Sequence, residues 1–212
     1  MSDVKGRRRY DSSRRRNQAQ QNHAAVLDAA RRLFLADGYA STTVPAIART
    51  AGVSVETVYK AFGNKSGLLR AVAEAALAGP GPTTTEQRSD AMRARETDPY
   101  TIVREWANFA AEVTPRGAPV ILVMRSAAAT SPDVADLLAR LDDERMHRMG
   151  EQAAFLRQHG HLRPGVTEAE ARDVMWAYTD PRLYELLVLR QQWPLERFRD
   201  FLARALTAAL LR

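Results

Sequence analysis

Apolar residues recur along most of the chain at the three- and four-residue spacing of an α-helix, and no stretch alternates apolar and polar residues convincingly as a half-buried strand does. The clearest stripe lies within 21–37 and is formed by Val26, Leu27, Ala30, Leu33 and Phe34. Further stripes predict helices at about 44–51, 55–62, 65–78, 99–113, 117–129, 132–159, 168–190 and 195–211. The pattern therefore predicts an all-α protein, in which Pro181 kinks or divides the helix that contains it.

The clearest break in this pattern is the stretch 79–85, which reads Gly-Pro-Gly-Pro-Thr-Thr-Thr and is typical of a loop. The predicted helices just before the break are short, and those after it are longer. We therefore expect one domain at 17–78 and a second at 79–212, connected through the helix that ends at residue 78. Residues 1–16 are expected to form a disordered arm.

The net charge of +6 is concentrated at the N-terminus, because residues 1–16 hold seven basic and two acidic side chains. Clustered arginine favours a polyanion such as nucleic acid, and a solubilising tail is the alternative. No apolar core of a signal peptide follows the arm, and the longest apolar run, 118–124, is too short to span a membrane. We therefore expect a soluble, cytoplasmic protein with no membrane partner.

Residues 43–62 have the spacing of a helix-turn-helix, the motif in which a second helix enters the major groove of DNA. Gly52 permits a tight turn, and Ala48 is small enough for two crossing helices to approach each other. Val58 and Phe62, four residues apart, form an inward stripe on the second helix. The remaining residues of that helix then face outward.

Outward polar groups around this motif are candidate DNA contacts. Thr57 and Glu56 can bond base edges, while Tyr59, Lys60 and Lys65 can reach phosphate oxygens. Three groups at the start of the preceding helix are further phosphate candidates: the hydroxyls of Thr42 and Thr43 and the amide of Val44. Glu56 has a second explanation, because a carboxylate in a first helical turn stabilises the helix by about 0.3–1 kcal/mol.

The stretch 24–70 carries a specific set of motifs: Ala29-Ala30-Arg31-Arg32-Leu33-Phe34, Gly38-Tyr39, Thr42-Thr43-Val44, Ile47-Ala48, Ala51-Gly52-Val53-Ser54, Thr57-Val58-Tyr59, Phe62 and Asn64-Lys65-Ser66-Gly67-Leu68-Leu69. By these motifs it resembles the N-terminal domain of the TetR family. The resemblance implies a homodimeric repressor with a three-helix DNA-binding head, joined to the core by a fourth helix. It implies DNA contacts at Val55, Glu56, Thr57, Tyr59, Lys60 and Lys65. Pro45 departs from the family, in which this position is often polar or basic.

The last two predicted helices are rich in large apolar residues, and the stretch 176–211 resembles the corresponding helices of one TetR subgroup. In that family these helices pair with their mates in a dimer, and packing within one subunit is the alternative. The resemblance implies a dimer interface at Tyr184, Leu187, Val188, Phe198, Phe201 and Leu202.

An effector pocket is expected among the helices after residue 79. Small-molecule sites are mostly apolar with a few polar anchors, although aromatic residues at helical spacing are more often core. The candidates are Trp106, Phe109, Met124, Phe155, Trp176 and Tyr178.

Catalytic and cofactor sites are not expected. The four histidines have no carboxylate or cysteine set at ligand spacing, and cysteine is absent from the chain. No nucleophile elbow, phosphate-binding loop or dinucleotide fingerprint occurs. We therefore expect no metal, no cofactor and no enzymatic activity.

These observations favour a ligand-responsive repressor that binds a palindromic operator in double-stranded DNA as a homodimer, with an unidentified small-molecule effector. In this interpretation the effector acts by shifting the helix at 65–78. Two alternatives remain open. One is a basic protein that binds nucleic acid non-specifically through its arginine arm, and the other is an all-helical ligand-binding protein or enzyme with a vestigial DNA-binding head.

Overall fold

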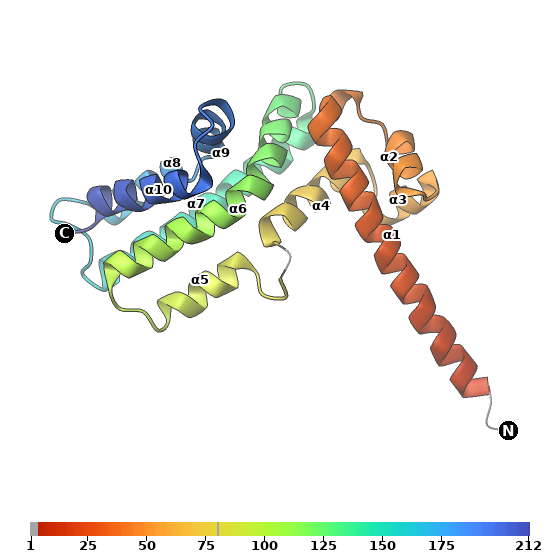
Figure 1. Cartoon of the computed structure of the whole chain (residues 1–212), viewed down its shortest axis with the longest axis horizontal. Helices are drawn as coiled ribbons and strands as arrows, with labels where there is room; N and C mark the ends of the chain where they lie inside the picture. Colours follow the sequence, from red (N-terminus) through yellow and green to blue (C-terminus); the bar gives the residue numbers. More distant parts are fainter. Residues whose placement is uncertain (1–3, 80) are drawn as a thin grey trace. The chain divides into compact units, whose positions relative to one another are not determined.

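The computed structural model describes residues 4–79 and 81–212 and, for residues 4–13, the backbone alone (Figure 1). Within these ranges the chain forms helices and turns without a strand, apart from one isolated antiparallel bridge between Leu162 and Leu211. The fold is thus all-α, as the sequence predicts. Two compact units divide the chain, at 1–72 and 73–212, and their boundary falls inside α4.

The first unit contains three helices and the start of a fourth: α1 (Val4–Ser41), α2 (Val44–Ala51), α3 (Val55–Phe62) and α4 (Lys65–Ala78). Its interior is built by apolar side chains that each element turns inward. The largest buried ones are Val26 and Phe34 of α1, Ile47 of α2, Val58 of α3, and Leu68, Leu69 and Val72 of α4. The boundaries of α2, α3 and α4 agree with those predicted from the sequence.

Helix α1 begins earlier than the sequence suggested. Residues 4–16, expected to be part of a disordered arm, are helical in their backbone, while residues 1–3 lie outside the described part of the chain. At the other end Gly38 has non-helical backbone angles (φ 77°, ψ 168°) that separate a last turn from the helix. A positive φ is accessible to glycine at little cost, which explains why the predicted stop is a glycine.

The second unit contains the end of α4 and the remaining helices: α5 (Thr85–Arg93), α6 (Pro99–Ala128), α7 (Pro132–Gln158), α8 (Glu168–Tyr178), α9 (Pro181–Tyr184), the π-helix η1 (Glu185–Arg190) and α10 (Leu195–Leu210). The long helix α6 packs against α5, α7, α9 and α10, and α8 packs against α7 and α10. Figure 1 shows α6 and α7 running alongside each other for most of their length.

Three features of this unit differ from, or refine, the prediction. Helix α5 is not among the predicted elements, although Thr84 and Gln87 form a reciprocal capping box at its start. Helix α6 is continuous where two helices were expected, despite Pro115 and Pro119 in its interior. Pro181 divides the predicted 168–190 helix, since α8 ends at Tyr178 and α9 begins at the proline.

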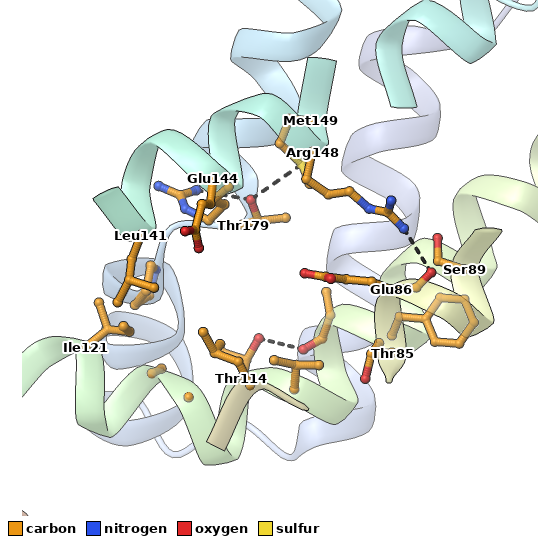
Figure 2. Close-up of a pocket in the computed structure, with 18 of the residues that line it drawn as sticks. Thr85, Glu86, Ser89, Thr114, Ile121, Leu141, Glu144, Arg148, Met149 and Thr179 are labelled. Carbon is orange, nitrogen blue, oxygen red and sulfur yellow. Dashed lines mark hydrogen bonds between the residues drawn. The ribbon is translucent and has the colours of Figure 1, made fainter. Parts of the chain in front are cut away.

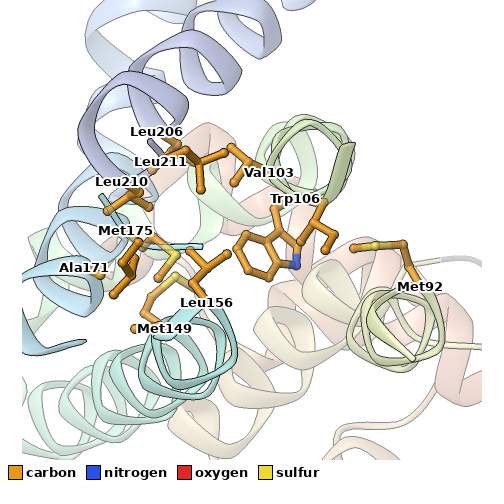
Figure 3. Packing of buried hydrophobic residues seen from close by; sticks show 13 residues of the cluster. Met92, Val103, Trp106, Met149, Leu156, Ala171, Met175, Leu206, Leu210 and Leu211 are labelled. Atoms are coloured by element: carbon orange, nitrogen blue, oxygen red, sulfur yellow. The ribbon is translucent and has the colours of Figure 1, made fainter. Parts of the chain in front are cut away.

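The main hydrophobic core of the second unit brings residues from five helices around Trp106 (Figure 3). Met149 and Leu156 of α7 and Met175 of α8 are among the residues that pack there. Among the described residues, no helix is both long enough and apolar enough to cross a membrane.

Candidate functional site

Short-range capping bonds fix the geometry of α2 and α3. Thr43 caps α2, its Oγ1 accepting a hydrogen bond from the Ala46 amide at 3.3 Å. Gly52 ends the helix in the left-handed conformation (φ 69°), which lets the chain turn at once toward α3. Ser54 then caps α3 by accepting from the Thr57 amide at 3.1 Å. The two helices form the helix-turn-helix that the sequence predicts.

The second helix of the motif has one buried face and one exposed face. Val58 is buried on the first unit's core, and Phe62 is half-buried with its ring 4.7 Å from that of His23. Glu56 and Lys60 are exposed, and Tyr59 exposes 48% of its surface. The exposed face therefore presents a carboxylate, a phenol and an ammonium group, all of which can form hydrogen bonds to a partner.

Val55 and Thr57 are only half-buried, so both remain accessible on the same helix. The Thr57 hydroxyl lies 2.8 Å from the Ser54 hydroxyl, and either can donate the hydrogen bond between them. Thr57 therefore retains hydrogen-bonding capacity toward a partner, because a hydroxyl has one proton and two lone pairs.

The structure corrects one of the predicted phosphate ligands. Thr42 is 2% exposed, and its hydroxyl lies within hydrogen-bonding distance of the carbonyls of Gly38 (2.8 Å) and Leu33 (3.1 Å). It closes the turn after Gly38 and is committed to the fold. Thr43 is exposed, whereas the Val44 side chain is buried, so Val44 can contribute through its backbone amide only.

Lys65, the first residue of α4, folds back onto the end of α1. Its ammonium lies 4.2 Å from the centre of the Tyr39 ring and donates to the Ala40 carbonyl at 3.4 Å. Burial lowers the pKa of Lys65 below its ordinary value. Asn64 directly precedes α4, and its Oδ1 accepts hydrogen bonds from the Gly67 amide (2.7 Å) and the Ser66 hydroxyl (2.8 Å).

A cavity of about 430 Å³ lies within the second unit, lined by α4, α5, α6, α7, α8 and α10 and by residues near them (Figure 2). Its volume falls in the range of about 300–1,000 Å³ that is usual for small-molecule sites. Most of its wall is apolar, as such sites generally require. Ile121 of α6, Leu141 and Met149 of α7, and Leu202 of α10 are representative.

The cavity contains two of the six aromatic and soft residues expected to form a pocket. Trp106 and Phe109 line it. Met124 is fully buried in the interior and lies away from it. Phe155, Trp176 and Tyr178 pack against the core clusters outside the cavity wall. Helical spacing identified aromatic side chains, but it did not distinguish those that face the cavity from those that face other helices.

Polar side chains also reach the cavity, and the sequence analysis missed them. Arg145 and Arg148 come from α7, and Glu86 and Ser89 from α5. Ser89 is 4% exposed and Trp106 is 6% exposed, and neither the Ser89 hydroxyl nor the Trp106 indole N–H has a hydrogen-bond partner in the described structure. Buried polar atoms are nearly always paired, so these two are available to a molecule in the cavity.

The helix-turn-helix unit matches a known family. Residues 26–72 match the model described as "Bacterial regulatory proteins, tetR family". This segment of the chain, which runs from α1 to α4, is therefore similar to that family. No curated protein matches the sequence.

Solved structures share the fold of most of the chain. NalD of Pseudomonas aeruginosa, the secondary repressor of the MexAB-OprM multidrug efflux pump, is 19% identical, with 92% of this chain and 98% of NalD covered and a TM-score of 0.70. SmeT, solved in complex with triclosan, is 22% identical over 90% of this chain and 92% of SmeT, with a TM-score of 0.71. The fatty acid degradation regulator FadR of Bacillus halodurans is 16% identical over 87% of this chain and 94% of FadR, with a TM-score of 0.72.

The residues expected at a tetR-family dimer interface fall into two groups. Tyr184, Phe198 and Leu202 are at most 7% exposed, and the Tyr184 ring meets the Phe198 ring edge-on at 5.7 Å. These three are core residues of a single subunit, which corrects the expectation. Leu187, Val188 and Phe201 are partly buried and retain accessible surface. The most exposed apolar side chains of this segment, Leu186 and Leu189 (49% each), were not among the expected residues.

An ion-pair network around the buried carboxylate of Asp180 fixes the start of α9. The carboxylate of Asp180 accepts hydrogen bonds from Arg182 at 3.0 Å and from Arg125 at 3.3 Å. Burial alone would raise the pKa of Asp180, but the hydrogen bonds from Arg182 and the charges of Arg125 and Arg182 hold it below its ordinary value. No group of three or more potential metal ligands occurs among the described side chains.

Proposed function

We propose that this chain is a ligand-responsive tetR-family repressor, which binds a palindromic operator as a homodimer and releases it when a small molecule occupies the cavity. The observation that carries the proposal is the exposed face of α3 within the segment that is similar to the tetR family. There Glu56, Tyr59 and Lys60 project from a helix that two caps and a buried Val58 hold in place. Such a helix is suited to a major groove.

We assign roles to the individual residues of this face. Lys60 and Tyr59 contact phosphate oxygens, and Thr57 and Val55 face base edges or thymine methyl groups. Glu56 either accepts from a cytosine amino group or stabilises the first turn of α3 through the helix dipole. Phosphate contacts at the flanks come from Lys65 and from the start of α2, through Thr43 and the Val44 amide.

Selection of bound sequences from a random DNA pool tests this assignment, since a repressor of this type enriches one palindrome. Lys60→Ala should then weaken binding to the selected operator and reduce the slope of affinity against salt by about one. Arg140→Ala is a matched control, because Arg140 is an exposed cation on α7 of the second unit. A pool that shows no enrichment, or equal losses in the two variants, would contradict the proposal.

The N-terminal arginines distinguish this function from non-specific binding. Arg14, Arg15 and Arg16 are exposed on α1 and can add sequence-independent phosphate contacts. Deletion of residues 1–16 should therefore weaken operator binding and lower its salt dependence, while the preference for the operator over random DNA persists. If the deletion abolished the preference along with the affinity, the protein would be a basic nucleic-acid-binding protein of low specificity.

The effector part of the proposal rests on the contacts of the last turn of α4. Leu77 and Ala78 line the cavity, and Arg116 of α6 donates from its Nε to the Ala76 carbonyl at 3.3 Å. A β-carbon at Gly117 would lie 2.9 Å from the Leu77 side chain, so α6 and α4 approach each other closely here. A ligand in the cavity therefore changes the surroundings of the helix that leads into the DNA-binding unit.

For the dimer, we propose that the accessible surface of η1 and α10 forms the contact. Leu186 and Leu189 expose large apolar side chains on η1, and Phe201 is only partly buried on α10. Burial of the remaining exposed half of each leucine is worth about half of the 1.5–3 kcal/mol for a fully exposed side chain, which favours a second copy of the chain over water on this surface. Such a dimer has two DNA-binding units for the two half-sites of a palindrome, which lie about 34–36 Å apart on DNA.

A further inference from the structure

The charged side chains that line the cavity differ in their pairing: its arginines are paired with carboxylates of the protein, whereas two of its glutamates are not. Arg148 of α7 bonds Asp90 at 2.9 Å and Glu151 at 3.0 Å, and it also donates to the Glu86 carbonyl at 2.9 Å. These partners outweigh the effect of burial and raise the pKa of Arg148 above its ordinary value. Its positive charge is therefore neutralised by carboxylates of the protein itself.

Arg145, the other arginine that lines the cavity, is also bound to groups of the protein itself. It donates to the Trp176 carbonyl at 2.5 Å and to Asp142 at 3.3 Å, and its guanidinium stacks over the Trp176 ring at 4.6 Å. An anionic ligand would have to break these internal contacts to reach either arginine. Because charged hydrogen bonds of this kind are worth about 1.5–3 kcal/mol each, the cavity is poorly suited to an anion.

Two carboxylates at the cavity have no such partner. Glu86 of α5 and Glu144 of α7 line it, and neither side chain makes an ion pair or hydrogen bond with another side chain in the described structure. Figure 2 shows both carboxylates pointing toward the cavity from opposite helices. Trp106 and Phe109 also line the cavity, and the faces of aromatic rings attract positive charge.

We propose that the ligand of this cavity is a lipophilic organic cation, an apolar molecule of drug size that carries a protonated amine or a quaternary ammonium group. This proposal rests on the effector role proposed above for the cavity. The apolar body lies against Trp106, Phe109 and the aliphatic wall, and the cationic group lies between Glu86 and Glu144. The unpaired Ser89 hydroxyl and Trp106 N–H are an independent sign of a binding site. Both are buried, and Trp106 can donate to any acceptor that the ligand carries.

The test compares two probes of equal chain length and opposite charge, decyltrimethylammonium and decane-1-sulfonate, by isothermal titration calorimetry on the full-length protein. The ammonium probe should bind at least tenfold more tightly than the sulfonate. An exposed ion pair contributes up to about 1 kcal/mol, so each of Glu86→Gln and Glu144→Gln should weaken ammonium binding by up to about fivefold. The double variant should lose about 10–20-fold, provided that its melting temperature matches that of the wild type.

Asp143→Asn is the matched control, because Asp143 is an exposed carboxylate next to Glu144 that lies outside the cavity wall. It should bind the ammonium probe within twofold of the wild type. Tighter binding of the sulfonate, no binding of the ammonium at 1 mM, or equal losses in Asp143→Asn and Glu144→Gln would each overturn the proposal.

The same preparation distinguishes this proposal from the regulatory function on which it rests. Operator binding is measured by gel shift without any probe, so a protein that binds its operator and ignores the cation contradicts only the ligand assignment. A protein that binds the cation through Glu86 and Glu144 and leaves operator affinity unchanged supports the ligand assignment and contradicts the effector role.

Discussion

Replacing Gly67 by alanine puts two opposing effects in competition at the start of α4. Alanine is the better helix former by about 1 kcal/mol, and the backbone angles of Gly67 are ones that any residue can adopt. Propensity alone therefore predicts that the substitution stabilises the protein. The surroundings predict the opposite, because a β-carbon at this position would lie 2.2 Å from the Phe62 carbonyl oxygen and 3.3 Å from the Asn64 Oδ1.

The steric effect should dominate, because the closest atom belongs to the backbone at the end of α3 and cannot rotate away. Ordinary contact at this point would require the two helices to separate by about 1 Å, and overpacking of this severity costs about 1–3 kcal/mol or more. After the gain in propensity, we expect a net loss of about 2 kcal/mol. For a chain of this size that corresponds to a melting temperature about 4–8 °C lower.

Gly150→Ala in α7 is the matched control, because the nearest neighbour of its added β-carbon is the Arg172 Cδ at an ordinary 3.8 Å. Propensity acts there without a clash, so the melting temperature should rise by about 2–4 °C. Both variants are measured by thermal unfolding, followed by circular dichroism at 222 nm. A Gly67→Ala variant as stable as Gly150→Ala would refute the argument that the Asn64 turn leaves no room for a side chain.

Three further changes test other parts of the structure. Asp180→Asn should lower stability at neutral pH by about 1–3 kcal/mol, because the carboxylate accepts charged hydrogen bonds from Arg125 and Arg182, whose side chains remain partly exposed. The folded pKa of Asp180 is depressed, so this contribution is present above about pH 4 and is lost as the pH falls through the lower folded value. Urea unfolding of wild type and variant should therefore converge in acid. Arg116→Met should leave cation affinity unchanged and reduce the effect of the cation on operator binding, compared by gel shift with and without ligand. Leu189→Glu should shift a homodimer toward monomer in sedimentation velocity without lowering the melting temperature of the subunit, because the side chain is half exposed.

The first unit was predictable from the sequence because its signals are local. Thr43 and Ser54 bond amides three residues ahead, and Gly52 meets a backbone requirement at its own position. None of these signals depends on how distant segments pack. Thr42 shows the limit, because its position beside Thr43 suggested a phosphate ligand, while its hydroxyl is used by the carbonyls of the preceding turn.

Helix α6 shows why the second unit was harder to predict. A proline inside a helix costs about 3 kcal/mol, so a break between 113 and 117 was the reasonable expectation at Pro115. The helix continues because its buried face includes Val120, Ile121 and Met124, and burial of each large apolar side chain is worth about 1.5–3 kcal/mol. That gain depends on packing against other helices, which lie far away in the sequence.

The cavity and the proposed dimer surface both depend on tertiary packing, which the sequence pattern does not show. An apolar residue at helical spacing lies on the inner face of its helix, but the spacing does not say whether it meets another helix, a cavity or a second subunit. Phe198 and Phe201 are three residues apart on α10, yet the first is 2% exposed and the second retains accessible surface. One capping signal was available and unused, the Thr84 and Gln87 box that begins α5.

The free energy needed for the proposed switch is similar to that of the hydrogen bond between Arg116 and the end of α4. A ligand can change operator affinity only if it binds the DNA-binding conformation and the released conformation with different affinity. The free energy of such regulatory coupling is typically about 1–3 kcal/mol. One charged hydrogen bond such as that from Arg116 to the Ala76 carbonyl is worth about 1.5–3 kcal/mol. Leu77, which lines the cavity and packs closely beside Gly117, is the neighbouring side chain that a ligand in the cavity would contact. In the proposed switch, the loss of this one bond corresponds to a change of about 10–150-fold in operator affinity, without any rearrangement of the core around Trp106.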